Sequence, residues 1–234
     1  MGSLSSIRAV SALLSMLAWL ALGAVASAQG PSAAGGYELL TPRGSGPFPA
    51  VVVMHGCDGV SAHTRAWAQR LVGWGYAALI VDSFRPRGIS SLCSQPLSVP
   101  PSVRAGDAIA AKAYLESLPN IAKGRIGLIG FSHGGWAALD AAGSFSAVVA
   151  YYPWCSGPVP ANTLVLIGSS DDWTPAQRCS GGSANLKVYS GATHAFDAHV
   201  DGTYLGHRMV YDAGAASDAE ERTRQFFAAR LGRP

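Results

Sequence analysis

Three residue types that could act together in catalysis occur in order along this chain: a serine between glycines, a pair of aspartates and a histidine. Residues 130–134 read Gly-Phe-Ser-His-Gly, with Ser132 at the centre, and Asp171, Asp172 and His194 follow. A serine hydroxyl is a weak nucleophile near neutral pH, so it needs a base within hydrogen-bond reach and an acid that orients this base. The types and order of these residues predict nucleophilic catalysis by Ser132.

The segment around Ser132 has the pattern of a nucleophile elbow. An apolar run at 126–129 precedes it and a predicted helix at 135–142 follows it, which is the strand–turn–helix setting of such an elbow. The serine there sits at a sharp turn with strained backbone angles, and small residues at 130 and 134 let neighbouring chain pass close by. The pentapeptide also occurs by chance in turns that have no catalytic role, so the motif alone is weak evidence. The aspartates and His194 further along the chain strengthen the interpretation of Ser132 as a nucleophile.

Short apolar runs alternate with longer segments of mixed polarity along the chain, which predicts β-α units. The runs lack period-2 alternation, and this favours strands covered on both faces, as in a parallel sheet between two layers of helices. Strands are expected at 50–54, 77–81, 126–129, 147–151, 164–167 and 186–189, and helices at 62–74, 103–117, 135–142, 175–184 and 217–231. Ser217 is the expected cap of the last helix. Ser132, the aspartates and His194 each follow a strand, so they should meet at one edge of the sheet.

The sequence resembles the dienelactone hydrolase-like branch of the α/β hydrolases, from about residue 49 to the C-terminal helix. The similar stretches are 55–59, 75–77, 82–88, the Ser132 elbow, 171–175 and 194–197. The resemblance implies an α/β-hydrolase fold, with a mostly parallel central sheet, helices on both faces and no substantial lid. It also implies Ser132 as nucleophile, His194 as general base and then acid, and Asp171 as the orienting carboxylate. The namesake enzymes have a cysteine where this chain has Ser132, so ester hydrolysis is a safer expectation than opening of the namesake lactone.

The two adjacent aspartates compete for the role of orienting acid. The spacing Gly168-x-x-Asp171-x-x-Thr174-Pro175 is similar to that of the family and favours Asp171. Asp172 is otherwise a helix-capping or solvated carboxylate.

An oxyanion hole is also expected, because the tetrahedral intermediate of acyl transfer places negative charge on the former carbonyl oxygen. In this fold one donor is the backbone N–H of the residue after the nucleophile, here His133. We assign the second to the backbone N–H of Cys57, in the loop that contains residues 55–57. His55 is expected to shape this loop rather than to transfer protons. Three other histidines are expected at the surface: His63, His199 and His207.

Four residues are candidates for substrate binding. The family binds a substrate carboxylate with arginines, which suggests Arg85 or Arg87, although an arginine in this loop could instead tie it to backbone carbonyls. Trp154 and Trp173 follow adjacent strands at the catalytic edge and could form apolar pocket walls or simply pack. We expect no cofactor and no metal, since neither a His-x-x-x-His spacing with a third ligand nor a Walker-type loop is present in the sequence.

Composition and charge limit the possible partners. With 49% hydrophobic and 13% charged residues, the chain can bury a substantial core in one domain, expected at 29–234. The 17 Lys plus Arg and 14 Asp plus Glu give a net charge of +3, and no basic cluster is interleaved with aromatics. Nucleic acid is therefore not an expected partner. The expected partner is a small-molecule ester or lactone substrate. The protein is expected to be a monomer or a weak homo-oligomer.

Residues 1–28 have the pattern of a secretory signal peptide. Arg8 precedes an apolar stretch at 9–26, and residues 26–28 read Ala-Ser-Ala, a small-x-small cleavage site. A membrane anchor is the alternative, since the stretch approaches the ~18 apolar residues that span a bilayer. No basic stop-transfer cluster follows it. We therefore expect cleavage, no stable membrane anchor afterwards, and a periplasmic or secreted protein.

The four cysteines lie beyond this segment, and an even number in an oxidising compartment predicts disulfides. In the sheet that the resemblance implies, the strand before Cys57 neighbours the strand that leads towards Cys93. The strand before Cys155 likewise neighbours the one followed by Cys179. This favours the pairs Cys57–Cys93 and Cys155–Cys179 at the catalytic edge, with four packed thiols as the alternative.

The predicted activity is hydrolysis of carboxylic esters or lactones through an acyl-enzyme on Ser132. An acyltransferase with the same triad would need only a different acceptor, and the residues leave that alternative open. A catalytically silent binding module of the same fold is a third interpretation. The complete set of Ser132, Asp171 and His194 argues against it.

Overall fold

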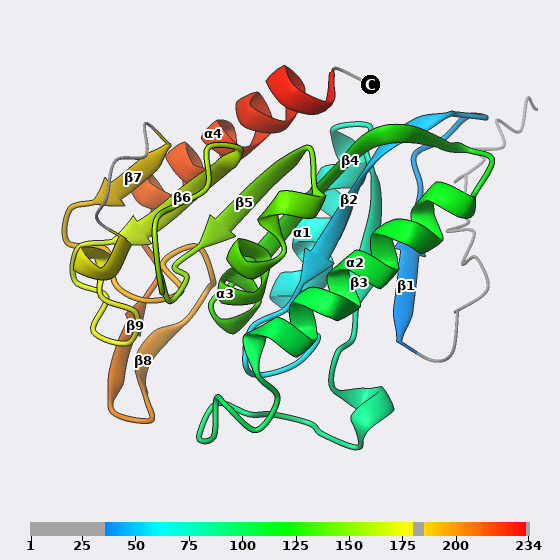
Figure 1. The fold of residues 1–234 in the computed structure, drawn as a ribbon. Coiled ribbons are helices and arrows are strands. Elements are labelled where there is room, and N and C mark those ends of the chain that lie inside the picture. Colours follow the sequence, from blue (N-terminus) through cyan, green and yellow to red (C-terminus); the bar gives the residue numbers. More distant parts are fainter. Residues whose placement is uncertain (1–35, 180–184, 233–234) are drawn as a thin grey trace, which may run out of the picture.

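A computed structural model describes residues 36–179 and 185–232 (Figure 1). The predicted signal peptide, residues 1–28, lies outside these ranges. Within them, no helix combines the length and the apolar composition that a membrane crossing requires.

A seven-stranded sheet forms the centre of the molecule, with strand order β1-β3-β2-β4-β5-β6-β7. Only β1 at one edge runs antiparallel, against β3, and the other neighbours are parallel. The strands are β1 (Tyr37–Leu40), β2 (Phe48–Met54), β3 (Ala77–Val81), β4 (Ile121–Phe131), β5 (Ala147–Tyr151), β6 (Thr163–Gly168) and β7 (Leu186–Tyr189). The expected α/β-hydrolase architecture is therefore present, and the carboxyl ends of the parallel strands lie along one edge (Figure 1).

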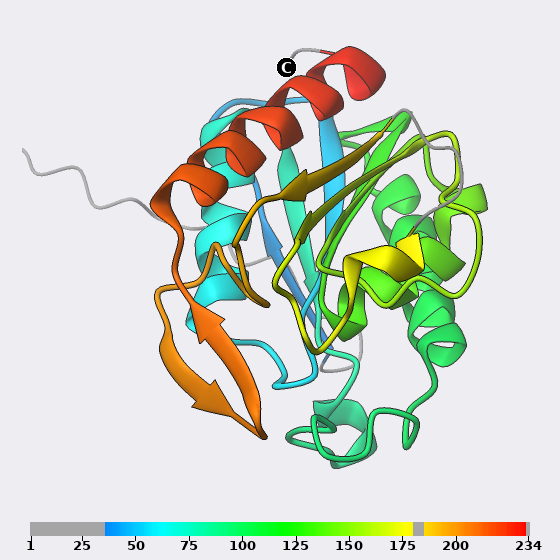
Figure 2. The same ribbon diagram turned by 90° about the vertical axis from the view of Figure 1, so that its left-hand side faces the viewer.

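Helices cover both faces of the sheet. On one face lie α1 (Ala62–Gly73) and α4 (Ala213–Leu231), and on the other lie α2 (Pro101–Ser117) and α3 (His133–Asp140) (Figure 2). The apolar runs supply both layers, because side chains alternate along a strand. In β2, Val51 and Val53 pack towards α1 and α4, whereas Val52 packs towards α2 and α3. The absence of period-2 alternation in the sequence follows from this double burial.

The remaining elements are a hairpin and short 3₁₀ helices that connect the parts of this layered fold. A hairpin of β8 (Asp201–Tyr204) and β9 (His207–Val210) projects beside the ends of β6 and β7 (Figures 1 and 2). Three short 3₁₀ helices complete the set: η2 (Arg85–Arg87), η3 (Ala142–Ser144) and η4 (Ala176–Cys179).

Two expectations about helices are wrong. Where the helix expected at 175–184 should begin, the structure has the 3₁₀ turn η4 (Ala176–Cys179), and the rest of that expected helix lies outside the described residues. The last helix begins four residues earlier than expected, because Asp212 caps it by accepting a hydrogen bond from the N–H of Ala215 at 2.9 Å. Ser217 therefore lies inside the helix.

Candidate active site

Ser132 occupies the sharp turn between β4 and α3. Its backbone has φ 53° and ψ −117°, a sparsely populated conformation for a residue with a Cβ. The turn is possible because the chain crosses itself closely on both sides. A Cβ at Gly130 would overlap the carbonyl oxygen of Gly134, and a Cβ at Gly134 would overlap that of His55. The backbone thus has the sharp strand–turn–helix geometry that a nucleophile elbow requires.

The structure brings Ser132, His194 and Asp171 together. Nε2 of His194 lies 2.9 Å from Oγ of Ser132, and Nδ1 of His194 lies 2.8 Å from Oδ2 of Asp171. The three residues follow β4, β7 and β6, whose carboxyl ends share one edge of the sheet. His194 and Asp171 are buried, at 3% and 4% exposure. An imidazole in this position can accept the hydroxyl proton while the carboxylate holds its orientation.

Asp171 and Asp172 lie in different surroundings. Oδ1 of Asp171 accepts hydrogen bonds from the N–H groups of Trp173 at 3.0 Å and Thr174 at 2.8 Å, and Oδ2 accepts one from the Thr174 hydroxyl at 2.8 Å. The side chain of Asp172 is 54% exposed and lies 3.3 Å from Nδ1 of His207. Asp171 is therefore the aspartate that contacts His194.

A buried carboxylate fixes the loop that carries His194. Asp197 accepts hydrogen bonds from Nε2 of His63 at 2.9 Å, Nε1 of Trp67 at 2.8 Å and the hydroxyl of Tyr152 at 2.9 Å. Burial alone would raise the pKa of Asp197, but the His63 charge and these hydrogen bonds lower it below the ordinary value. The side chain of His63, which was expected at the surface, is 22% exposed and reaches inward to this carboxylate. Its partner is 134 positions away in the sequence, and a local pattern could not reveal it.

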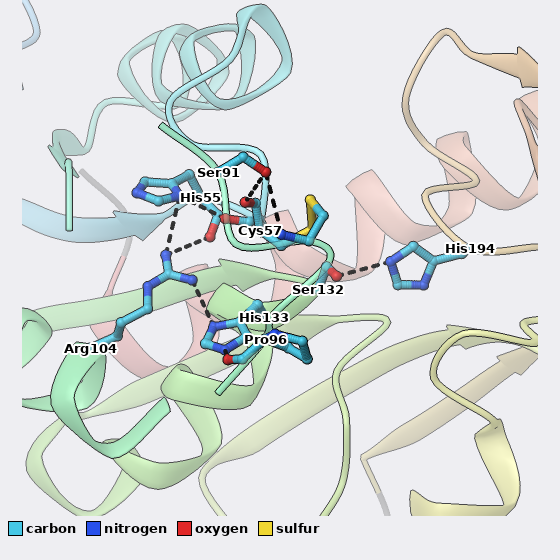
Figure 3. Close-up of a disulfide and its surroundings, with 10 residues drawn as sticks. His55, Cys57, Ser91, Pro96, Arg104, Ser132, His133 and His194 are labelled. Atoms are coloured by element: carbon cyan, nitrogen blue, oxygen red, sulfur yellow. Dashed lines mark hydrogen bonds between the residues drawn. A yellow bond between two sulfur atoms is a disulfide. The ribbon is translucent and has the colours of Figure 1, made fainter. Parts of the chain in front are cut away.

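The segment expected to supply an oxyanion donor, residues 55–57, follows β2 and is tied to the loop after β3. The carbonyl oxygen of Cys57 accepts hydrogen bonds from the N–H of Leu92 at 2.9 Å and the hydroxyl of Ser91 at 3.2 Å. A disulfide joins Cys57 to Cys93 beside them (Figure 3).

Arg104, on α2, is the main site residue that the sequence analysis missed. Its side chain is fully buried and lies between His55 and His133 (Figure 3). Nη2 donates to the carbonyl oxygen of His55 at 2.7 Å, and Nη1 donates to Nδ1 of His133 at 2.9 Å. Arg104 therefore holds the two segments that carry the expected oxyanion donors. The sequence did contain a signal for this residue. Arg104 lies at helical spacing from the apolar residues Ala108, Ala111 and Leu115, and a charged residue on such a face indicates a buried ionic or hydrogen-bonding role.

Both histidines beside Arg104 are neutral. Nε2 of His133 donates to the carbonyl oxygen of Pro96 at 2.7 Å, so Nδ1 is free to accept from Arg104. Burial and the Arg104 charge lower the pKa of His133 to about 4. The same two causes lower the pKa of His55 to about 3. His55 and His133 therefore act here as neutral hydrogen-bonding groups, while Arg104 keeps its charge at neutral pH.

A cavity of about 270 Å³ opens beside Ser132. Both candidate tryptophans line it, together with Trp136, which was not predicted although it lies one helical turn after Ser132. The lining consists of Cys57, Cys93, Pro96, Leu97, Ser132, His133, Trp136, Trp154, Trp173 and Thr174.

Neither candidate arginine is part of this lining in the portion of the chain that the structure describes. The guanidinium of Arg87 makes two 2.8 Å hydrogen bonds to Asp107 and one of 2.6 Å to the carbonyl oxygen of Ser83. The side chain of Arg85 is 74% exposed and lies beside Asp82. Arg87 thus ties its loop in place, which is the structural alternative considered for this residue.

Cys57 pairs with Cys93 and Cys155 pairs with Cys179, with Cα separations of 4.8 and 5.0 Å. This is the pairing that the sequence favoured, and it leaves no free cysteine among the described residues. In residues 36–179 and 185–232, no group of three or more His, Cys, Asp or Glu side chains is placed to hold a metal ion.

Comparison with known proteins agrees with this architecture. The model of the dienelactone hydrolase family matches residues 36–231. A Synechocystis sp. protein named as a carboxymethylenebutenolidase is 26% identical over 230 residues, covering 82% of this chain and 91% of its own. The dienelactone hydrolase-like promiscuous phosphotriesterase P91, from metagenomic libraries, is 22% identical with a TM-score of 0.65, over 83% of this chain and 92% of its own. A thermophilic esterase from Thermogutta terrifontis is 16% identical with a TM-score of 0.58, over 82% of this chain and 88% of its own.

Proposed function

The chain belongs to the dienelactone hydrolase family, and we propose that it is an exported serine hydrolase that cleaves carboxylic esters or lactones through an acyl-enzyme on Ser132. The observation that carries this proposal is the continuous hydrogen-bond chain from Ser132 through His194 to Asp171. The relative named as a carboxymethylenebutenolidase supports a reaction at an ester or lactone carbonyl.

In the proposed first half-reaction, Oγ of Ser132 attacks the substrate carbonyl carbon while Nε2 of His194 takes the hydroxyl proton. The negative charge on the carbonyl oxygen is met by the backbone N–H groups of Cys57 and His133. The C–O bond to the leaving group then breaks, and His194 returns its proton to that oxygen. The product is an alcohol and an acyl-enzyme, or, from a lactone, an acyl-enzyme that still carries the alcohol.

In the second half-reaction, His194 removes a proton from a water molecule that attacks the acyl-enzyme. The ester bond to Ser132 breaks, the carboxylic acid leaves, and Ser132 regains its proton from His194. Asp171 keeps Nδ1 of His194 protonated and stabilises the imidazolium present during both steps. The three hydrogen bonds to Asp171 from Trp173 and Thr174 hold this carboxylate in place.

Two observations support export. Residues 1–28 have the composition of a signal peptide. The described part of the chain also carries two disulfides, and disulfides form and persist in oxidising compartments such as the periplasm and the extracellular space.

The test uses the purified mature protein with a fluorophosphonate and with simple esters. We expect one phosphonyl adduct per chain, on the peptide that contains Ser132, and equal amounts of acid and alcohol from each ester. Adding a competing alcohol or amine should change the products little, whereas dominant transfer to that acceptor would identify an acyltransferase. An adduct on another residue would overturn the assignment of Ser132.

A further inference from the structure

The cavity beside Ser132 presents apolar groups to a substrate. Its walls include the indole rings of Trp136, Trp154 and Trp173, and the Cys57–Cys93 disulfide contributes sulfur atoms. Leu97 is 64% exposed although it lines the same cavity. An apolar side chain that is left in water at the cavity would be covered when a substrate binds.

Two arginines contact described lining residues of this cavity: Arg104 contacts His133 and Arg178 lies over the ring of Trp154. Arg104 lies behind His133, fully buried, with its Nη atoms directed to His55 and His133 (Figure 3). His133 uses Nδ1 to accept from Arg104 and Nε2 to donate to Pro96, so its ring offers the substrate no charge. None of the described lining residues is Lys, Arg, Asp or Glu.

The tryptophans are held from behind by other elements. Trp173 stacks on His207 of β9, with ring centroids 4.5 Å apart and planes at 15°. The guanidinium of Arg178 lies 3.8 Å from the centroid of the Trp154 ring, and the Trp154 and Trp136 centroids are 6.1 Å apart. The walls are therefore formed before a substrate arrives. At about 270 Å³ the cavity is slightly smaller than the ~300–1,000 Å³ typical of ligand sites, which suits a single ring-sized group.

We propose that the substrates are uncharged esters that place an apolar, preferably aromatic, group between these tryptophans, and that esters with a carboxylate on this group are rejected. The proposal rests on the proposed function of Ser132. An aromatic group gains from contact with flat aromatic walls. A carboxylate would lose its water in a described lining that has no charged side chain, because Arg178 lies outside this lining against the ring of Trp154, and that loss is unfavourable. The specificity therefore differs from the arginine-bound carboxylate that the family resemblance suggested.

Matched methyl esters test this proposal, because a methylene group insulates the reacting carbonyl from the ring. Methyl (4-isopropylphenyl)acetate and methyl (4-carboxyphenyl)acetate are similar in size and differ in charge. We expect kcat/KM for the carboxylate to be lower by roughly 100-fold or more. The kcat/KM for methyl phenylacetate should exceed that for methyl cyclohexylacetate by several-fold. Equal or better turnover of the carboxylate would overturn the proposal.

Variants locate the selectivity. We expect Trp154→Ala and Trp136→Ala each to lower the ratio of kcat/KM for methyl phenylacetate to that for methyl acetate by about tenfold. Trp74→Ala is the matched control, because Trp74 packs against Trp67 and is not part of the cavity lining, and it should keep the wild-type ratio. Unchanged ratios in both cavity variants would contradict the assignment of these walls.

The same measurements separate this proposal from the proposed function. If methyl acetate is not hydrolysed and the fluorophosphonate does not label Ser132, the proposed function fails and this inference fails with it. If both occur but the carboxylate ester is preferred, Ser132 retains its role and only the proposed substrate class is wrong.

Discussion

Ser132 lies between two groups of residues that both contain histidine, and the two groups differ in what lies behind the imidazole. On one side His194 has the buried carboxylate of Asp171 at 2.8 Å from Nδ1. On the other side His133 has the buried guanidinium of Arg104 at 2.9 Å from Nδ1. A carboxylate favours the imidazolium, whereas a guanidinium disfavours it. The same side chain is thereby suited to proton transfer on one side of Ser132 and to holding backbone in position on the other.

The largest expected difference is between the two histidines themselves. We expect His194→Ala to lower kcat/KM for a simple ester by roughly 10⁴-fold or more, as loss of a general base does in a triad. His133→Gln, which keeps a side chain that can bond Pro96 and Arg104, should cost about tenfold or less, because only the backbone N–H of His133 is assigned to the reaction. Steady-state kinetics on both variants measures the contrast, and similar losses would remove it.

The second comparison uses the adjacent aspartates. Asp171→Asn should lower kcat by roughly 10³- to 10⁴-fold, because an amide cannot hold the required tautomer of His194 or stabilise its charge. Asp172→Asn should change kcat less than about threefold, since the side chain of Asp172 is exposed and lies beside His207 rather than His194. The reverse ranking would make Asp172 the orienting acid.

A smaller effect is expected from Arg104→Met, which preserves approximate volume and removes the charge. The carbonyl oxygen of His55 and Nδ1 of His133 would lose their donor, so the N–H groups assigned to the oxyanion would be positioned less well. We expect kcat to fall by roughly 10- to 100-fold, with KM for methyl acetate little changed. Arg104→Lys should recover part of the loss. An unchanged kcat in a folded Arg104→Met variant would show that the oxyanion segments do not depend on it.

The last prediction concerns stability in acid rather than turnover. Burial and Arg104 lower the pKa of His55 to about 3 and that of His133 to about 4, whereas histidines in the unfolded chain titrate near ~6.5. Below this pH the unfolded state binds more protons than the folded state. The free energy of unfolding should therefore fall as pH drops from about 6.5 towards 4, by up to roughly 1.4 kcal/mol per pH unit and histidine.

Urea unfolding at several pH values checks this expectation. His133→Gln should make the acid slope shallower, because one of the two contributing histidines is gone. His199→Gln serves as the control, since His199 is exposed, and should leave the slope unchanged. A wild-type stability that does not depend on pH between 6.5 and 4 would contradict the neutral state of the buried histidines.

The sequence predicted those parts of the molecule that short segments encode. Six parallel strands are visible as apolar runs, and Ser132 is visible because its glycines and its strand are adjacent to it. Arg104 and Asp197 were missed because their partners are remote, 49 positions away for His55 and 134 for His63. The β8–β9 hairpin was missed because its strands are short and largely exposed, so they lack an apolar pattern. Trp136 was overlooked although it lies on the helix that Ser132 begins.

The most direct test of the central claim is acid quenching of the enzyme within milliseconds of mixing with an activated ester, followed by intact mass and peptide mapping. The account predicts a mass increase equal to one acyl group, on the peptide that contains Ser132. The acyl group should be absent from Ser132→Ala. An acyl group on another residue, or undiminished ester turnover by Ser132→Ala, would contradict the account.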